Sequence, residues 1–244
     1  MKRESGTTLI EVLIAVTLLS LLSVAMLTAM RVGLMAFSKT NNKLMENRRV
    51  AGAQRVVQEE LEGMMPVVAP CGDPPGPGPA KTALFEGQPQ TMRLVSTFSL
   101  QQGWRGPPQI LELFVIPGED GRGVRLVVNE IPYTGPAGTA LLCTGHTRDS
   151  QTGGNFAVFA PVQAGPNSFV LADKLAYCRF SYYTIPLDHS VPPHWTPVWN
   201  IAGWPFALRI EMAPLDPDPS RLQPITVTAP IHIHRSPEIP YVDY

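Results

Sequence analysis

The N-terminal fold is decided by Leu9–Met30, which reads LIEVLIAVTLLSLLSVAMLTAM. As a helix rising ~1.5 Å per residue, this segment spans about 33 Å, enough to cross a ~30 Å hydrocarbon core. Lys2 and Arg3 precede it, and this positive flank predicts a cytoplasmic N-terminus with the rest of the chain across the membrane. Glu11 does not suit a plain anchor, because a carboxylate inside a bilayer costs at least ~2.5–3.5 kcal/mol and needs a positively charged partner.

The prolines divide the chain into two parts. All 26 prolines of this 244-residue sequence lie at or after Pro66. Because proline removes a helical hydrogen bond and clashes with the preceding turn, the sequence permits one helix over residues 7–65 and no long helix after it. Apolar residues recur at helical spacing at Val50, Ala53, Val57, Leu61 and Met64. This stripe predicts packing against the chain's own globular domain, against the helices of other subunits, or both.

The remainder of the chain has the pattern of a β domain. A loop rich in proline and glycine is expected over residues 66–82. The strands expected after it include Met92–Leu100, Ile110–Ile116, Val124–Val128, Leu175–Ile185 and Phe206–Met212. Alternation along Leu175–Ile185 places on one face Ala176, Cys178, Phe180 and Tyr182. No helical pattern separates the strands, so we expect an antiparallel multi-strand domain over residues 83–244 and an α+β fold overall.

Residues 2–15, with the sequence KRESGTTLIEVLIA, resemble the prepilin signature of type IV pilins and type II secretion pseudopilins. In that family a membrane peptidase cuts after the glycine of a short basic leader and methylates the new N-terminus, and the fifth mature residue is glutamate. The resemblance implies a leader over residues 1–6, cleavage between Gly6 and Thr7, N-methylation of Thr7, and Glu11 as the fifth mature residue. The first mature residue is usually phenylalanine, whereas here it is Thr7. An ammonium at Thr7 would pair with Glu11 of a neighbouring subunit and favour assembled over isolated subunits.

Two other interpretations of the N-terminal segment compete with a prepilin leader. One is a secretory signal peptide cleaved near residues 23–25, and the other is a generic signal anchor. The apolar segment is longer than that of a typical signal peptide and contains a glutamate, while an anchor leaves the glycine and the glutamate without a role. The mature N-terminus would be Thr7 for a prepilin, Met26 for a signal peptide and Met1 for an anchor.

The second half of the chain resembles minor pseudopilin J of type II secretion and the related PilW-like minor pilins. The resemblance rests on a strand with Phe180-Ser181-Tyr182, a loop bearing Trp195, Trp199 and Trp204, and a strand over Pro205–Met212. The proline-rich loop and an insert between Pro132 and Asn155 depart from the family pattern. The resemblance implies a non-enzymatic subunit of the tip of a short periplasmic pseudopilus, which helps to initiate assembly and the export of folded proteins.

The same resemblance implies where the protein lies and what it contacts. It would be a single-pass protein of the inner membrane with a periplasmic C-terminal domain. Its partners would be the prepilin peptidase, the major pseudopilin, and I-like and K-like tip subunits. Two alternatives are a PilW-like minor type IV pilin that primes pilus assembly or adhesion, and a membrane-anchored periplasmic binding protein or enzyme.

The sequence indicates no catalytic residues, metal site or cofactor. A net charge of −1 lacks the excess of positive charge that is typical of nucleic-acid-binding proteins. The sequence also contains no G-x-S-x-G motif, which would indicate a serine nucleophile. His232 and His234 share a strand face, but a third metal ligand is not visible near them. We therefore expect a protein without enzymatic activity, cofactor, metal or nucleic-acid partner.

The three cysteines, Cys71, Cys143 and Cys178, form no C-x-x-C pair, which excludes a zinc ribbon or a thioredoxin-type motif. In an exported protein an odd count permits one disulfide and one free thiol. Cys178 lies on the apolar face of its expected strand, which suits either a buried thiol or a disulfide. We expect Cys143 to pair with Cys178 and Cys71 to be free.

Overall fold

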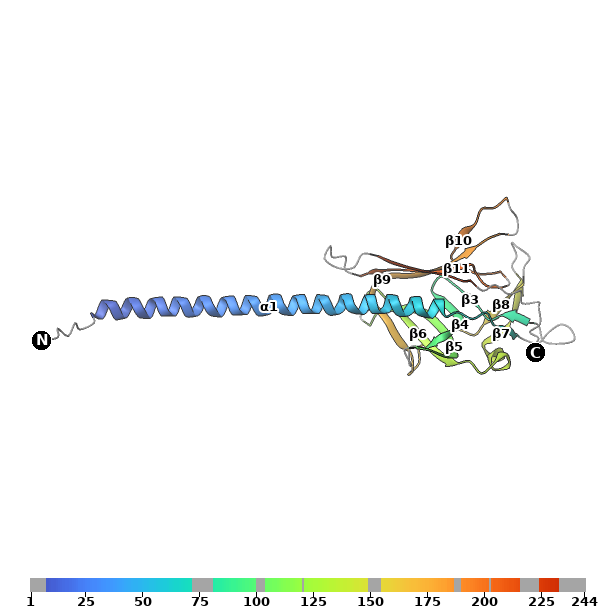
Figure 1. Cartoon of the computed structure of the whole chain (residues 1–244), viewed down its shortest axis with the longest axis horizontal. Helices are drawn as coiled ribbons and strands as arrows, with labels where there is room; N and C mark the ends of the chain where they lie inside the picture. The colour runs from blue at the N-terminus through green and yellow to red at the C-terminus, as the bar shows by residue number, and fades with distance from the viewer. Residues whose placement is uncertain are drawn as a thin grey trace. The chain divides into compact units, whose positions relative to one another are not determined.

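The computed structural model describes residues 8–71, 81–99, 104–119, 121–148, 155–186, 190–201, 203–215 and 224–232. The chain divides into two compact units, Met1–Arg48 and Arg49–Tyr244. Helix α1 (Leu9–Glu62) begins in the first unit and ends in the second (Figure 1). The proline-free part of the sequence thus forms a long helix, and the strands all follow it.

Helix α1 ends where the chain has to approach strand β4 (Thr91–Ser99) closely. At Gly63 the backbone N–H still donates to the Glu59 carbonyl at 3.0 Å, while its own carbonyl accepts from Thr97 N–H at 2.9 Å. A Cβ atom on Gly63 would lie 2.6 Å from Ser96 Oγ, so a larger residue would push the helix end away from the sheet. The helix therefore ends at a close contact with β4 before it reaches the first proline.

One eight-stranded sheet forms the centre of the second unit. Its strands are β3 (Glu86–Gly87), β4, β5 (Trp104–Pro117), β6 (Val124–Pro132), β9 (Phe169–Thr184), β10 (His194–Thr196), β11 (Ala207–Pro214) and β12 (Ile225–Pro230). Their order is β12-β11-β9-β6-β5-β4-β3, with β10 paired to β9. Every pairing is antiparallel, which confirms the expected α+β fold.

The sheet curls so that its β3 end returns to β9. The Trp199 N–H donates to the Gly87 carbonyl at 2.8 Å, and the Phe180 N–H donates to the Pro89 carbonyl at 2.9 Å. A Cβ atom on Gly87 would lie 2.7 Å from both Trp199 Cβ and Tyr182 Cζ, so only glycine fits between these two side chains. This closure covers part of an edge that would otherwise expose unpaired backbone groups.

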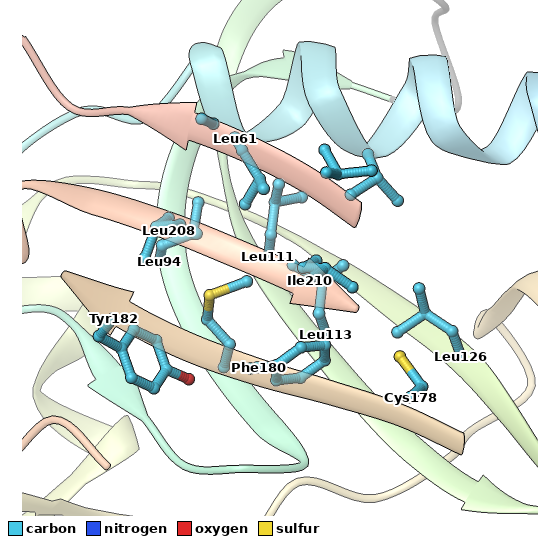
Figure 2. Packing of buried hydrophobic residues seen from close by; sticks show 14 of the residues in the cluster. Leu61, Leu94, Leu111, Leu113, Leu126, Cys178, Phe180, Tyr182, Leu208 and Ile210 are labelled. Carbon is cyan, nitrogen blue, oxygen red and sulfur yellow. The ribbon is translucent and has the colours of Figure 1, made fainter. Parts of the chain in front are cut away.

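The last turns of α1 pack into the concave face of this sheet. Val57 and Leu61 are buried in the main core, and Met64 is partly buried against it. Figure 2 shows Leu61 among side chains from β4, β5, β9 and β11, including Leu94, Leu111 and Leu208. The predicted apolar stripe therefore packs on its own domain at these positions, while the side chains of Val50 and Ala53 lie outside the described residues.

A smaller layer covers the opposite face of β4 and β5. It contains the pair β1 (Val68–Pro70) and β2 (Lys81–Ala83), the short 3-10 helix η1 (Pro136–Leu142), and the hairpin β7 (Cys143–Arg148) and β8 (Asn155–Phe159). Val95 and Ile110 are buried beneath it in a second core cluster. Within the segment 66–82, expected as a proline-rich loop, β1 and β2 form a short antiparallel pair on either side of the proline-rich residues. The unexplained insert after Pro132 supplies η1 and β7.

A bulge in β9 overturns the expected position of Ala176. The register with β11 changes from Ala213 opposite Tyr177 to Pro214 opposite Leu175, which leaves Ala176 without a direct partner. The extra residue rotates the strand locally. Leu175 is therefore buried together with Cys178, Phe180 and Tyr182, whereas Ala176 is exposed.

The disulfide joins Cys71 to Cys143, so the prediction of a Cys143–Cys178 pair with Cys71 free was wrong. Cys71 directly follows β1 and Cys143 begins β7, and their Cα atoms are 5.1 Å apart within the second core cluster. Cys178 faces the main core instead, where its thiol is free. Burial raises the pKa of the Cys178 thiol to about 12, which keeps it protonated and unreactive.

We predict that peptide mapping without reduction recovers Cys71 linked to Cys143, and that alkylation labels Cys178 only after unfolding. The disulfide spans 72 residues of sequence, for which a chain-entropy treatment gives about 4 kcal/mol of stabilisation. Replacing Cys71→Ser should therefore lower the Tm markedly, whereas Cys178→Ala should leave the mapped disulfide intact. A peptide that links Cys143 to Cys178 would contradict this assignment.

Candidate functional site

The N-terminal part of α1 exposes apolar side chains on every side. Between Leu9 and Phe37 the large apolar side chains are 52–84% exposed in the chain alone. The segment Leu9–Ser38 contains an 18-residue window with a mean hydropathy of 2.5 and is long and apolar enough to cross a membrane. A helix that is apolar all round is typical of a membrane span, because a helix on a soluble domain needs a polar face.

The hydroxyl groups of this segment bond to the helix itself. Thr17 Oγ1 donates to the Ile14 carbonyl and Ser23 Oγ to the Leu19 carbonyl, each at 2.8 Å. Ser20, Thr28 and Ser38 make equivalent bonds to carbonyls three or four residues before them. In hydrocarbon, where no water is present to accept these bonds, this arrangement removes the cost of an unsatisfied hydroxyl.

Glu11 is the one ionisable residue of Leu9–Met30, and it lies in the first turn of α1. The helix begins where the N–H groups of Glu11 and Val12 donate to the Thr8 carbonyl at 3.0 and 3.3 Å. The Glu11 side chain is exposed, and its carboxylate has no hydrogen-bond or ion-pair partner among the described residues. The positive end of the helix dipole favours a negative charge in this turn. The predicted cleavage residues Gly6 and Thr7 lie outside the described part of the chain.

The three tryptophans on which the resemblance to minor pseudopilins partly rests have different surroundings. Trp199 and Trp204 are buried in the main core, as expected for aromatic packing. Trp195 on β10 is half-buried, and the Arg209 guanidinium lies 3.7 Å from the centroid of its ring. At this distance the pair forms a cation–π contact that fixes β10 against β11.

Sequence reasoning missed a buried charged cluster around Arg93 on β4. The Arg93 side chain is fully buried, and its Nε donates to Glu112 Oε1 at 2.9 Å while Nη1 donates to Glu86 Oε2 at 2.6 Å. Its Nη2 donates to the Ala160 carbonyl at 2.8 Å, and its guanidinium lies 5.2 Å from the centroid of the Phe159 ring. The cluster thus attaches the end of β8 to the sheet. An arginine between apolar residues of an expected strand was the only local signal.

A second buried ionisable residue, Glu60, lies on the last turns of α1. Glu60 is fully buried, and neither of its carboxylate oxygens has a hydrogen-bond partner among the described residues. Its backbone carbonyl accepts from Ser96 Oγ at 2.8 Å, which holds the residue against β4. Burial, and secondarily the negative charge of Glu130, raises the pKa of the Glu60 carboxyl well above its usual range.

The remaining candidate ligands do not come together in the described residues. These residues contain no group of three or more His, Cys, Asp or Glu side chains that could hold a metal ion. His232 is exposed, and its expected neighbour His234 lies outside the described part of the chain. Cys143, which precedes His146 by three residues, is part of the disulfide and offers no free thiolate to a metal.

Comparison with protein families places a known motif at the N-terminus. Residues 1–27 match the family described as Prokaryotic N-terminal methylation motif. The chain therefore carries a prepilin-type methylation motif followed by an apolar N-terminal helix, which supports the pilin and pseudopilin class and is consistent with anchoring in a membrane. Comparison with curated proteins and with solved structures gives no match.

We predict that Glu60→Gln stabilises the protein increasingly as the pH rises. A carboxyl group with a raised pKa contributes its stability at low pH and loses it as the pH rises through the folded-state pKa, because the ionised form has to be buried. Glutamine cannot ionise, so the Tm difference between the variant and the wild type should be small near about pH 5 and grow towards about pH 9.

Thermal unfolding of the full chain in detergent across this pH range measures the difference. The control is Glu62→Gln, which changes an exposed carboxylate two residues further along the same helix. The stabilisation that grows with pH should be specific to Glu60→Gln. A pH-independent effect of Glu60→Gln would show that Glu60 does not ionise with the expected cost.

Proposed function

We propose that this protein is a non-enzymatic subunit of a pilus-like filament, made as a precursor that is cleaved after Gly6 and methylated at Thr7. One observation carries the proposal: a methylation motif over residues 1–27 is joined to an apolar helix whose one ionisable group, Glu11, has no partner among the described residues. An anchor alone has no use for this carboxylate, whereas a filament does.

The chemistry of the filament contact follows from the cost of charge in lipid. Cleavage creates an ammonium at Thr7, four residues before Glu11 in the sequence, so we infer that both groups enter the bilayer near the same surface. Neither group is stable alone in hydrocarbon, so the Thr7 ammonium of one subunit pairs with the Glu11 carboxylate of the next. The pair favours assembly and fixes the axial offset between neighbouring helices.

Within this class we assign the protein to the J-like minor pseudopilins of a type II secretion system, at the tip of the pseudopilus. The assignment is supported by the strand with Phe180 and Tyr182, the tryptophan-bearing loop after it, and β11, which pairs with that strand. Its partners are I-like and K-like tip subunits, the major pseudopilin and the prepilin peptidase. The N-terminal helix lies in the inner membrane and the β domain in the periplasm, where the Cys71–Cys143 disulfide is stable.

We predict that Glu11→Val leaves membrane insertion intact but reduces incorporation into the filament about ten-fold or more, because the ammonium of the neighbouring subunit loses its partner. Alkaline extraction of membranes measures insertion, and cross-linking to the major and tip pseudopilins measures incorporation. Glu11→Asp, which keeps the charge, should retain part of the incorporation.

The matched control is Glu119→Gln, which removes a carboxylate that is 76% exposed on the β domain and should incorporate normally. Cross-linking of Glu11→Val at the wild-type level would contradict the proposed pairing. Wild-type protein that cross-links to type IV pilins and not to I-like or K-like subunits would contradict the J-like assignment while leaving the filament role in place.

A further inference from the structure

A cleft of about 110 Å³ lies where β2, β3 and β8 meet the loop that carries Trp199. A single water needs only about 10–15 Å³ by the same measure, so the cleft accommodates a larger group. Its lining contains the apolar residues Phe85, Phe156, Val158 and Ile201 and the acidic residue Glu86. The Gly87–Trp199 contact that closes the sheet forms part of the same lining.

Glu86 brings unbalanced negative charge to this cleft. Its Oε2 accepts from Arg93, while its other carboxylate oxygen has no partner among the described residues. Arg93 also pairs with Glu112, whose second oxygen accepts from Asn129 at 2.9 Å. One guanidinium therefore serves two carboxylates. Burial raises the pKa of Glu86 despite the opposing effect of Arg93, and the charge of Glu112 adds to the rise.

Apolar side chains lead from the surface to this carboxylate. Val158 is 38% and Ile201 is 46% exposed at the mouth of the cleft, while Phe85 and Trp199 are buried in its wall. A ligand that fits must have an apolar stem and a cationic head. Among protein side chains, arginine and lysine combine these two features.

We propose that this cleft binds an arginine or lysine side chain presented by a partner protein, with the cationic head on Glu86 and the stem against Val158 and Ile201. The head takes up the free oxygen of Glu86 and balances the second carboxylate of the Arg93 cluster. Binding in the cleft is independent of the filament. That the partner is a neighbouring subunit rests on the function proposed above.

The test uses the full chain in detergent micelles and the indole N–H resonance of Trp199, which donates to the Gly203 carbonyl at 3.1 Å beside the cleft. The probes are n-butylguanidinium, n-butylammonium and the neutral n-butylurea, whose shape matches the first. We expect a saturable shift of the Trp199 resonance with each of the two cations. The affinity for n-butylurea should be at least about ten-fold lower, because this neutral compound cannot form the charge-assisted hydrogen bond. The cation that binds with the higher affinity shows whether the cleft prefers an arginine or a lysine side chain.

The test variant is Glu86→Gln, which keeps an oxygen that can accept from Arg93 and removes the charge. It should reduce n-butylguanidinium affinity about ten-fold, whereas Glu119→Gln, a change at an exposed carboxylate, should leave it unchanged. Equal binding of n-butylurea and n-butylguanidinium by the wild type, or no saturable shift, would overturn the proposal without any variant. Undiminished binding by folded Glu86→Gln would do the same. None of these outcomes depends on cleavage after Gly6 or on filament assembly.

Discussion

The apolar side chains between Leu9 and Phe37 have to leave water, and this constraint determines how the N-terminal part of the chain is built. Each buried Leu, Ile or Val side chain contributes roughly 1.5–3 kcal/mol, so their exposure together would be prohibitive. The helix can enter lipid because its backbone is satisfied internally and its hydroxyls bond to preceding carbonyls. Glu11 is the exception, since its carboxylate needs a cation that the described part of its own chain does not provide.

The same helix meets a different requirement at its other end. From Val57 to Leu61 one face is buried against the curled sheet, and Gly63 lets the chain approach β4 closely enough to leave the helix. Beyond that point β4 and β5 are covered on both faces. The disulfide between Cys71 and Cys143 secures the outer layer, and the Arg93 cluster attaches β8 to the sheet. The outer layer also forms one wall of the Glu86 cleft.

The features that sequence analysis predicted are those encoded by local spacing. Helix α1 follows from the apolar stripe and the absence of proline, and the strands follow from two-residue alternation. The predicted burial of Ala176 was wrong because a bulge in β9 reverses which residues face the core, and the sequence alternation gives no sign of it. The predicted disulfide pairing was wrong because β1 and β7 meet in the layer that covers β4 and β5. A contact of this kind leaves no periodic pattern in the sequence. The pairing of Arg93 with Glu86 and Glu112 was missed because it depends on the register between β3, β4 and β5, which the spacing within a single strand does not reveal.

The central claim is that the apolar helix belongs to a processed filament subunit, and intact-mass spectrometry of the protein purified from membranes tests it most directly. Cells that contain a prepilin peptidase should yield a chain that begins at Thr7 and carries one added methyl group. A chain that begins at Met1 would indicate a plain anchor, and one that begins at Met26 a secretory signal peptide. Either result would contradict the account, because a chain that begins at Met1 has no ammonium at Thr7 and a chain that begins at Met26 has lost Glu11 itself.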